Sequence, residues 1–276
     1  MMYLYVAFLG LLQGITEFLP VSSSGHLSLF QNFFGGHAPD NLFNVLLHFA
    51  TLLAVCVFYR RDIAEMIMEF FRAIRDLFSP KHRSEKVPAA RRLVVMIVCG
   101  TLPLVVVLPF KDMVESLGAS TLFIGCALLV TGLLLFASDR FSRGQKTERT
   151  MTVADALLIG CGQALAVVPG LSRSGTTISA GVARGLGRPF AVRFSFLLSL
   201  PAVLGATLLE VLDVVRDGAA TDLSAFQLGL GMVVAAVSGY FAIAFIKRLA
   251  DKGRFGGFAY YCWAVGLATI IATFLV

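Results

Sequence analysis

Six long runs of apolar residues recur along the chain and are separated by polar segments. Each run is about 20 residues long, which is the length that an α-helix needs to cross the hydrocarbon core of a bilayer. The runs cover residues 42–59, 92–110, 119–137, 190–212, 226–246 and 256–276. This pattern predicts an all-α polytopic membrane protein with six transmembrane helices in a single membrane domain, residues 1–276.

Four shorter, polar-studded segments form two further pairs. One pair covers 3–19 and 24–34, and the other covers 153–168 and 175–186. The pairs are interrupted at Pro20, Gly25, Pro169, Gly170 and Gly175. Irregular backbone is tolerated at membrane depth only where protein or a cavity covers it. We therefore interpret each pair as a re-entrant helical hairpin rather than as one kinked helix.

Composition and charge fit this interpretation. Of the residues, 57% are hydrophobic and only 14% are charged, whereas a soluble domain carries about 25% charged residues. The net charge of +6 is read first as a topology signal, because Lys and Arg accumulate in cytoplasmic loops, and nucleic-acid binding is disfavoured. If both hairpins are re-entrant, all of the 23 Lys and Arg residues except Lys111, Arg173 and Arg216 lie on the cytoplasmic side. Both termini are then periplasmic.

The segment 61–91 belongs to this cytoplasmic side. Apolar residues recur at helical spacing through 61–79 between Arg, Asp and Glu residues. Such a pattern is typical of an amphipathic helix on a membrane surface. We expect a helix there, followed by a loop.

The two hairpins are also related to each other. At an offset of 150 residues, Gly10, Gln13, Ser22, Ser24 and Gly25 coincide with identical residues at 160, 163, 172, 174 and 175. The repeat halves are 1–138 and 151–276, and each holds one hairpin and three spans. Because three is odd, the halves enter the membrane from opposite sides, as in inverted-topology repeats, whose broken elements converge on a site within the membrane. The repeat alone suggests a secondary transporter.

The first hairpin carries a set of reactive side chains. Gln13 and Glu17 are four residues apart and share a helix face, and an acid at this depth is a functional-site hypothesis by default. Ser22, Ser23 and Ser24 follow, and His26 lies one turn further on. A hydroxyl, a carboxylate and an imidazole so close in sequence can serve as nucleophile and general acid or base. His48, within the first span, is expected to be solvated or packed.

The second hairpin has the features of a phosphate site. It reads Pro169-Gly170-Leu171-Ser172-Arg173-Ser174-Gly175-Thr176-Thr177. Small residues let successive backbone N–H groups surround an anion, and the guanidinium of Arg173 can bind a phosphate through two hydrogen bonds. An ion pair between Arg173 and Glu17 is compatible with this role when no substrate is bound.

Together the two motifs resemble the undecaprenyl pyrophosphate phosphatase family, bacterial membrane phosphatases of the bacitracin-resistance type. The resemblance lies in Gln13, Glu17 and the stretch Pro20–His26, followed by Pro169–Thr177, and it extends over essentially the whole chain. Gln13 stands where many members have glutamate. Ser24-Gly25-His26 also resembles part of an acid phosphatase motif, but the other residues of that motif would fall on Ser179 and Ala183, which disfavours that superfamily.

The resemblance implies hydrolysis of a C55 polyprenyl diphosphate to the monophosphate, which recycles the lipid carrier for peptidoglycan and confers bacitracin resistance. By position, it implies functional roles for Glu17, Ser23, His26, Arg173, Ser174 and Thr177. It also implies Mg²⁺ or Ca²⁺ near Glu17, held by the diphosphate, and no organic cofactor. The remaining residues expected to bind the diphosphate are Gln13, Ser22, Ser24, Gly170, Ser172, Gly175 and Thr176.

In the mechanism that we favour, Ser23 attacks the terminal phosphorus, Glu17 and His26 transfer protons, and Arg173 stabilises the phosphate oxygens. His26 as nucleophile, or water activated by Glu17, remains an alternative. A transporter or lipid flippase is the competing function, and it leaves the Ser, His and Glu set unused. We expect the protein to lie in the cytoplasmic (inner) membrane, with its site open to the periplasm and a polyprenyl diphosphate as its partner. A monomer and a homodimer are both compatible with the sequence.

Overall fold

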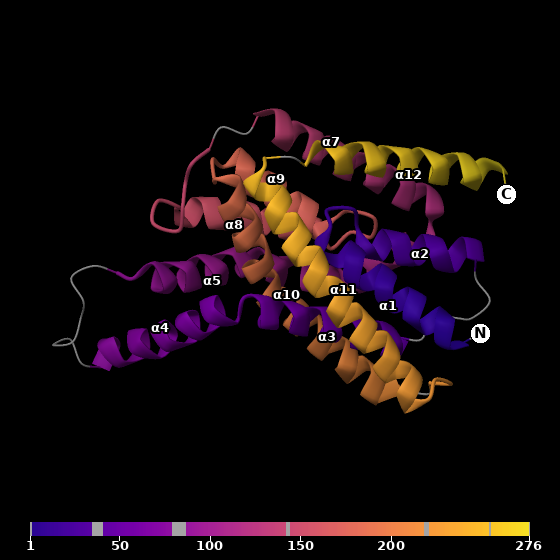
Figure 1. The fold of residues 1–276 in the computed structure, drawn as a ribbon, viewed down its shortest axis with the longest axis horizontal. Helices are drawn as coiled ribbons and strands as arrows, with labels where there is room; N and C mark the ends of the chain where they lie inside the picture. The colour runs from indigo at the N-terminus through magenta and orange to yellow at the C-terminus, as the bar shows by residue number, and fades with distance from the viewer. Residues whose placement is uncertain are drawn as a thin grey trace.

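The computed structural model describes residues 2–34, 41–78, 87–141, 144–217, 221–253 and 255–275. These residues are helical, and their only β-type pairing is one bridge between Lys146 and Leu186. The helices are α1 (Met2–Phe18), α2 (Ser23–Phe34), α3 (Asn41–Phe58), α4 (Arg60–Phe78), α5 (Ala89–Val107), α6 (Lys111–Ser116), α7 (Thr121–Phe141), α8 (Val153–Leu165), α9 (Arg173–Ala183), α10 (Arg188–Asp217), α11 (Ala225–Asp251) and α12 (Gly256–Leu275). Figure 1 shows their arrangement.

Five of the described helices are long and apolar enough to cross a membrane, namely α5, α7, α10, α11 and α12. They coincide with predicted spans to within a few residues. The remaining predicted span, 42–59, is helix α3, which qualifies only together with α4, from which it is bent by 83°. The fold is therefore that of a multi-pass, all-helical membrane protein.

Helix α4 is the predicted amphipathic helix, while residues 79–86 of the predicted loop lie outside the described residues. It runs beside α5 (Figure 1). Arg91 of α5 donates hydrogen bonds to Glu69 at 3.2 Å and to Asp76 at 2.9 Å. This bond from Arg91 holds the pKa of Asp76 below its usual range. Glu69 is buried while Phe70 and Phe71 are exposed, so in this part of α4 the acids that bind Arg91 face the protein and these aromatic side chains point away.

Both predicted hairpins are present as helix pairs. Helices α1 and α2 pack together after a turn at residues 19–22, and α8 and α9 pack together after a turn at 166–172. The capping serines are equivalent: Ser22 Oγ accepts from Gly25 N at 3.2 Å, and Ser172 Oγ accepts from Gly175 N at 3.1 Å. Each cap satisfies one of the N–H groups that a helix start leaves without a partner.

The first helix of each hairpin packs against the other half of the chain. Helix α1 lies on α11, where a Cβ at Gly10 would be only 2.4 Å from the backbone oxygen of Gly231. Helix α8 lies on α5, where a Cβ at Gly160 would be 2.2 Å from the backbone oxygen of Gly100. Only glycine allows backbones to approach this closely. Gly10 and Gly160, which the 150-residue offset aligns, thus make equivalent helix crossings.

The two hairpin turns meet inside the bundle. A Cβ at Gly25 would lie 3.1 Å from the Cα of Gly170, and a Cβ at Gly175 would lie 3.3 Å from the Cβ of Pro20. Each tip glycine therefore contacts the turn of the opposite hairpin. This contact brings the starts of α2 and α9, which are distant in sequence, to one place.

Candidate active site

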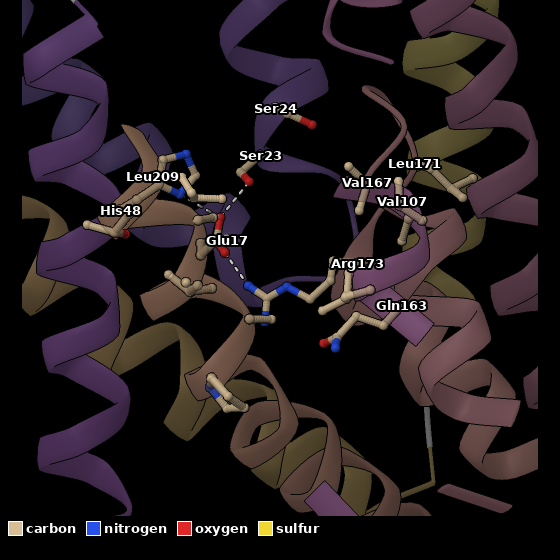
Figure 2. Close-up of a pocket in the computed structure, with 18 of the residues that line it drawn as sticks. Glu17, Ser23, Ser24, His48, Val107, Gln163, Val167, Leu171, Arg173 and Leu209 are labelled. Atoms are coloured by element: carbon tan, nitrogen blue, oxygen red, sulfur yellow. Dashed lines mark hydrogen bonds and ion pairs between the residues drawn. The ribbon is translucent and has the colours of Figure 1, made fainter. Parts of the chain in front are cut away.

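The site is built where the two turns converge. Ser22 adopts a left-handed backbone conformation with φ +71°, which is uncommon for a residue other than glycine and is concentrated at functional sites. Immediately after the two capping serines, Ser23 begins α2 and Arg173 begins α9. Both side chains point towards Glu17, near the end of α1 (Figure 2).

Glu17 is the centre of the polar network. Its carboxylate is buried, with 8% of the residue exposed. Oxygen Oε2 accepts hydrogen bonds from Ser23 Oγ at 2.6 Å and from Gln13 Nε2 at 3.1 Å. Oxygen Oε1 accepts from Nη2 of Arg173 in an ion pair. The ion pair between Glu17 and Arg173, which the sequence made compatible with phosphate binding, is thus present in the structure.

Arg173 uses only part of its guanidinium in this pair. Atom Nη1 is buried and has no hydrogen-bond partner among the described residues. A buried donor without a partner costs about 1–3 kcal/mol, and a guanidinium matches the oxygens of a phosphate well. Arg173 is thus held in place by Glu17 while it keeps a donor for an anion.

These groups line one end of a cavity of about 730 Å³. Glu17, Ser23, His48 and Arg173 form its polar end. Its other walls are mainly apolar and come from the carboxyl-terminal part of α5 and from the middle of α10. They include Leu104, Val105, Leu108, Pro201, Val203, Leu208 and Leu209. The cavity can therefore hold a ligand with an anionic head and an apolar chain.

The remaining residues predicted to bind the diphosphate fall into two groups. Ser22, Ser24 and Ser172 line the cavity, and their binding of a diphosphate stays a prediction. The others do not line it, although Gln13 reaches it indirectly through Glu17. These others are Gln13, Gly170, Ser174, Gly175, Thr176 and Thr177.

The side chains of the second group build the turn. Ser174 Oγ donates to the Leu19 backbone oxygen at 3.2 Å, and Thr177 Oγ1 lies 2.6 Å from Ser195 Oγ. Gly170 has φ +87° and packs on α7, where a Cβ would be 2.8 Å from the Cβ of Ala127. In this conformation these residues position Arg173 and the turn rather than face the cavity.

The structure does not bring His26 to Glu17. Its Nδ1 lies 2.8 Å from the Ser22 backbone oxygen, and its Nε2 lies 2.8 Å from the hydroxyl of Tyr261 on α12. The His26 and Tyr261 rings are stacked, with centroids 5.6 Å apart. His26 does not line the cavity, so its predicted part in proton transfer stays a prediction. Tyr261, 235 residues away in sequence, carried no signal.

His48 is the residue that the sequence interpretation missed. It was expected to be solvated or packed without a part in the site, yet it lines the cavity, with Nδ1 3.2 Å from Gln13 Nε2 and 3.9 Å from Glu17 Oε2. A signal was present, because an ionisable side chain within a membrane span is by default a candidate for function. The same argument that selected Glu17 applies to His48.

The donor set does not form a protein-held metal site. Among the described residues no group of three or more His, Cys, Asp and Glu side chains could hold a metal ion. Glu17 is the one acidic residue that lines the cavity among those described, and both of its oxygens already accept hydrogen bonds. Mg²⁺ and Ca²⁺ prefer several oxygen ligands, which these residues do not supply.

Comparison with known proteins agrees with the motifs. The profile of the family described as bacitracin resistance protein BacA matches residues 6–268. An undecaprenyl-diphosphatase of Methanobrevibacter smithii is 40% identical over 270 residues, which are 96% of this chain and 95% of that protein. Proteins with the same name from Halothermothrix orenii and Desulforapulum autotrophicum are 40% and 41% identical, with at least 96% of each chain covered. By sequence over nearly its full length, the chain belongs to the BacA family.

Proposed function

We propose that this protein hydrolyses undecaprenyl diphosphate to undecaprenyl phosphate and inorganic phosphate. The observation that carries the proposal is the placement of Ser23 and Arg173 on the two oxygens of Glu17, at the polar end of a largely apolar cavity. Relatives over the full chain are named undecaprenyl-diphosphatase. This reaction recycles the lipid carrier of peptidoglycan synthesis and thereby confers bacitracin resistance.

The geometry supports Ser23 as the nucleophile. Its Oγ donates to Glu17 at 2.6 Å, so the carboxylate can accept the proton as the serine oxygen attacks the terminal phosphorus. The bond from this phosphorus to the bridging oxygen breaks, and undecaprenyl phosphate leaves. Water then hydrolyses the phosphoserine and releases inorganic phosphate. In the alternative, water activated by Glu17 attacks the phosphorus directly. No phosphoserine then forms, and the bond from Ser23 serves only to hold Glu17 in place.

Arg173 supports this step electrostatically. Charge on the equatorial oxygens of the transferred phosphoryl group is stabilised mainly by fixed donors and cations. Nη1 of Arg173 is the buried cationic donor without a partner at this end of the cavity, within the described part of the chain. When Ser23 attacks, Glu17 takes up the serine proton and becomes neutral, so it needs less of the arginine charge.

The apolar walls suit the polyprenyl chain. Val105, Leu108, Leu208 and Leu209 line the cavity and are also exposed at the surface of the bundle. Exposed apolar side chains on membrane helices face lipid, so the cavity is open on the side from which a lipid substrate enters. A transporter would use the same walls, but it would give no role to the bond between Ser23 and Glu17.

For the membrane topology we propose six spans, with α3 as the sixth, and two re-entrant hairpins in an inverted-topology repeat. The equivalent crossings at Gly10 and Gly160, together with the Lys and Arg distribution, support this arrangement. It places both termini and the cavity mouth on the periplasmic side of the cytoplasmic membrane, and α4 on the inner surface. We further propose that a Mg²⁺ or Ca²⁺ ion, if used, arrives bound to the diphosphate.

Phosphate release by the purified protein tests the function. We expect release from undecaprenyl diphosphate and from farnesyl diphosphate, and loss of at least 100-fold in kcat, about 2.7 kcal/mol, for Ser23→Ala and for Arg173→Ala. Ser138→Ala is a matched control, because that hydroxyl is buried and bonds only to its own helix at Leu135. A protein that binds the lipid without releasing phosphate would support a transporter or flippase instead.

A further inference from the structure

A second glutamine, Gln163 on α8, is buried in the cavity wall without any hydrogen bond. It is 1% exposed, and neither its amide nitrogen nor its amide oxygen has a partner among the described residues. It lines the same cavity as Arg173. An amide left in this way costs about 1–3 kcal/mol, so such groups in a binding site indicate that a ligand completes them.

The repeat explains why this amide is left without a partner. Gln13, the equivalent of Gln163, donates to the carboxylate of Glu17 one turn later. At the position equivalent to Glu17, the second half has Val167, which offers no acceptor. The amide equivalent to the one that binds a carboxylate oxygen in the first half is therefore buried at the cavity wall with its donor unused. An anionic oxygen of a ligand is the chemically matching partner.

Figure 2 shows the surroundings of Gln163. Gln163 lies on the side of Arg173 away from Glu17 and Ser23, with Val107 and Val167 nearby. The amide of Gln163 has an unused donor that can bind the phosphate group next to the one that Nη1 of Arg173 stabilises. Because Ser23 defines the place of the phosphorus that is attacked, the group beside Gln163 is the other phosphate, which carries the lipid.

We propose that Gln163 binds the lipid-linked phosphate of the diphosphate and thereby positions the terminal phosphate against Ser23. This role rests on the proposed function and adds a residue to it. Gln163 takes no part in proton transfer or bond formation. It is a positioning residue whose loss weakens the binding of substrate and of lipid phosphate product more than it slows the chemical step.

Steady-state kinetics of Gln163→Met tests this role, because methionine has a similar length and no donor. We expect KM for farnesyl diphosphate to rise about tenfold, the effect of one lost hydrogen bond to a charged group, with kcat reduced much less. Gln163→Glu keeps the shape and adds negative charge, so its KM should rise further. Ser179→Ala is the control: that buried hydroxyl also lacks a partner but lies outside the cavity.

Product inhibition separates binding from a structural effect. Gln163→Met should weaken inhibition by farnesyl monophosphate about tenfold, as for KM, and leave inhibition by inorganic phosphate unchanged. Weaker inhibition by inorganic phosphate alone, or unchanged KM in both Gln163 variants, would overturn the assignment while leaving the function intact. If the wild-type protein released no phosphate, the proposed function itself would fail.

Discussion

The helix crossing at Gly160 should accept no side chain, whereas a nearby glycine on the same helix should. A Cβ at position 160 would lie 2.2 Å from the backbone oxygen of Gly100 on α5. A Cβ at Gly162 would meet nothing closer than a methyl group of Thr176 at 3.4 Å, which is ordinary contact. Gly160→Ala and Gly162→Ala are therefore a matched pair on α8.

The expected difference follows from these distances. Both variants gain about 1 kcal/mol of helix propensity, so that gain cancels between them. At Gly160 the obstacle is backbone, which cannot change rotamer, and α5 and α8 must separate by about 1 Å, enough to lose a quarter to a half of each contact. Overpacking of this kind costs about 1–3 kcal/mol, and this cost is the predicted difference in the free energy of unfolding.

Thermal unfolding in detergent measures this difference in stability between the two variants. With a shift of about 2–4 °C per kcal/mol for a chain of this size, Gly160→Ala should unfold about 5 °C below Gly162→Ala. The repeat predicts the same result at the crossing of α1 with α11, where a Cβ at Gly10 of α1 meets the Gly231 oxygen, whereas a Cβ at Gly229 of α11 meets nothing within 4 Å. If Gly160→Ala unfolds at or above the temperature of Gly162→Ala, the close crossing of α5 and α8 is wrong.

Three further outcomes are expected. Glu17→Gln should abolish phosphate release and lower the free energy of unfolding by about 3–5 kcal/mol, because Arg173 keeps a buried charge without its partner. Turnover and the unfolding temperature measure these two effects, and a fully active variant would contradict the prediction. Tyr261→Phe should lower kcat up to about tenfold, because it removes the hydrogen bond that orients His26, whereas Tyr260→Phe should leave kcat unchanged. If the two variants have the same kcat, His26 takes no part in catalysis. The divalent ion concentration for half-maximal phosphate release should rise with the diphosphate concentration and not with the protein concentration.

The elements were largely predictable because membrane helices have a simple sequence signature. Length and hydropathy alone located α5, α7, α10, α11 and α12 to within a few residues. Proline and glycine located both hairpin turns. The 83° bend between α3 and α4 was harder to see, because only a switch from apolar to amphipathic composition at Tyr59 marks it.

The motifs predicted several residues of the site but not the directions of all their side chains. Motif residues that touch one another across the two hairpins, such as Glu17 and Arg173, could be paired because their charges are opposite. The direction of a side chain at a helix start could not be read from the motif. His26 and Thr177 therefore proved to contact Tyr261 and Ser195 instead of the cavity. Those partners come from distant helices, and only tertiary packing determines them.

The duplicated scaffold explains how one carboxylate serves two tasks. Ser23 and Arg173 are equivalent under the 150-residue offset, and each is the first helical residue after a capping serine. Each therefore projects from an equivalent position towards the place where the turns meet, and they bind opposite oxygens of Glu17. The position equivalent to Glu17 holds Val167, so no second acid competes for Arg173 or repels an anion. A symmetric backbone thus holds a nucleophile and a cation on the same carboxylate. The two pairs of equivalent positions that differ, Ser23 with Arg173 and Glu17 with Val167, make the site directional.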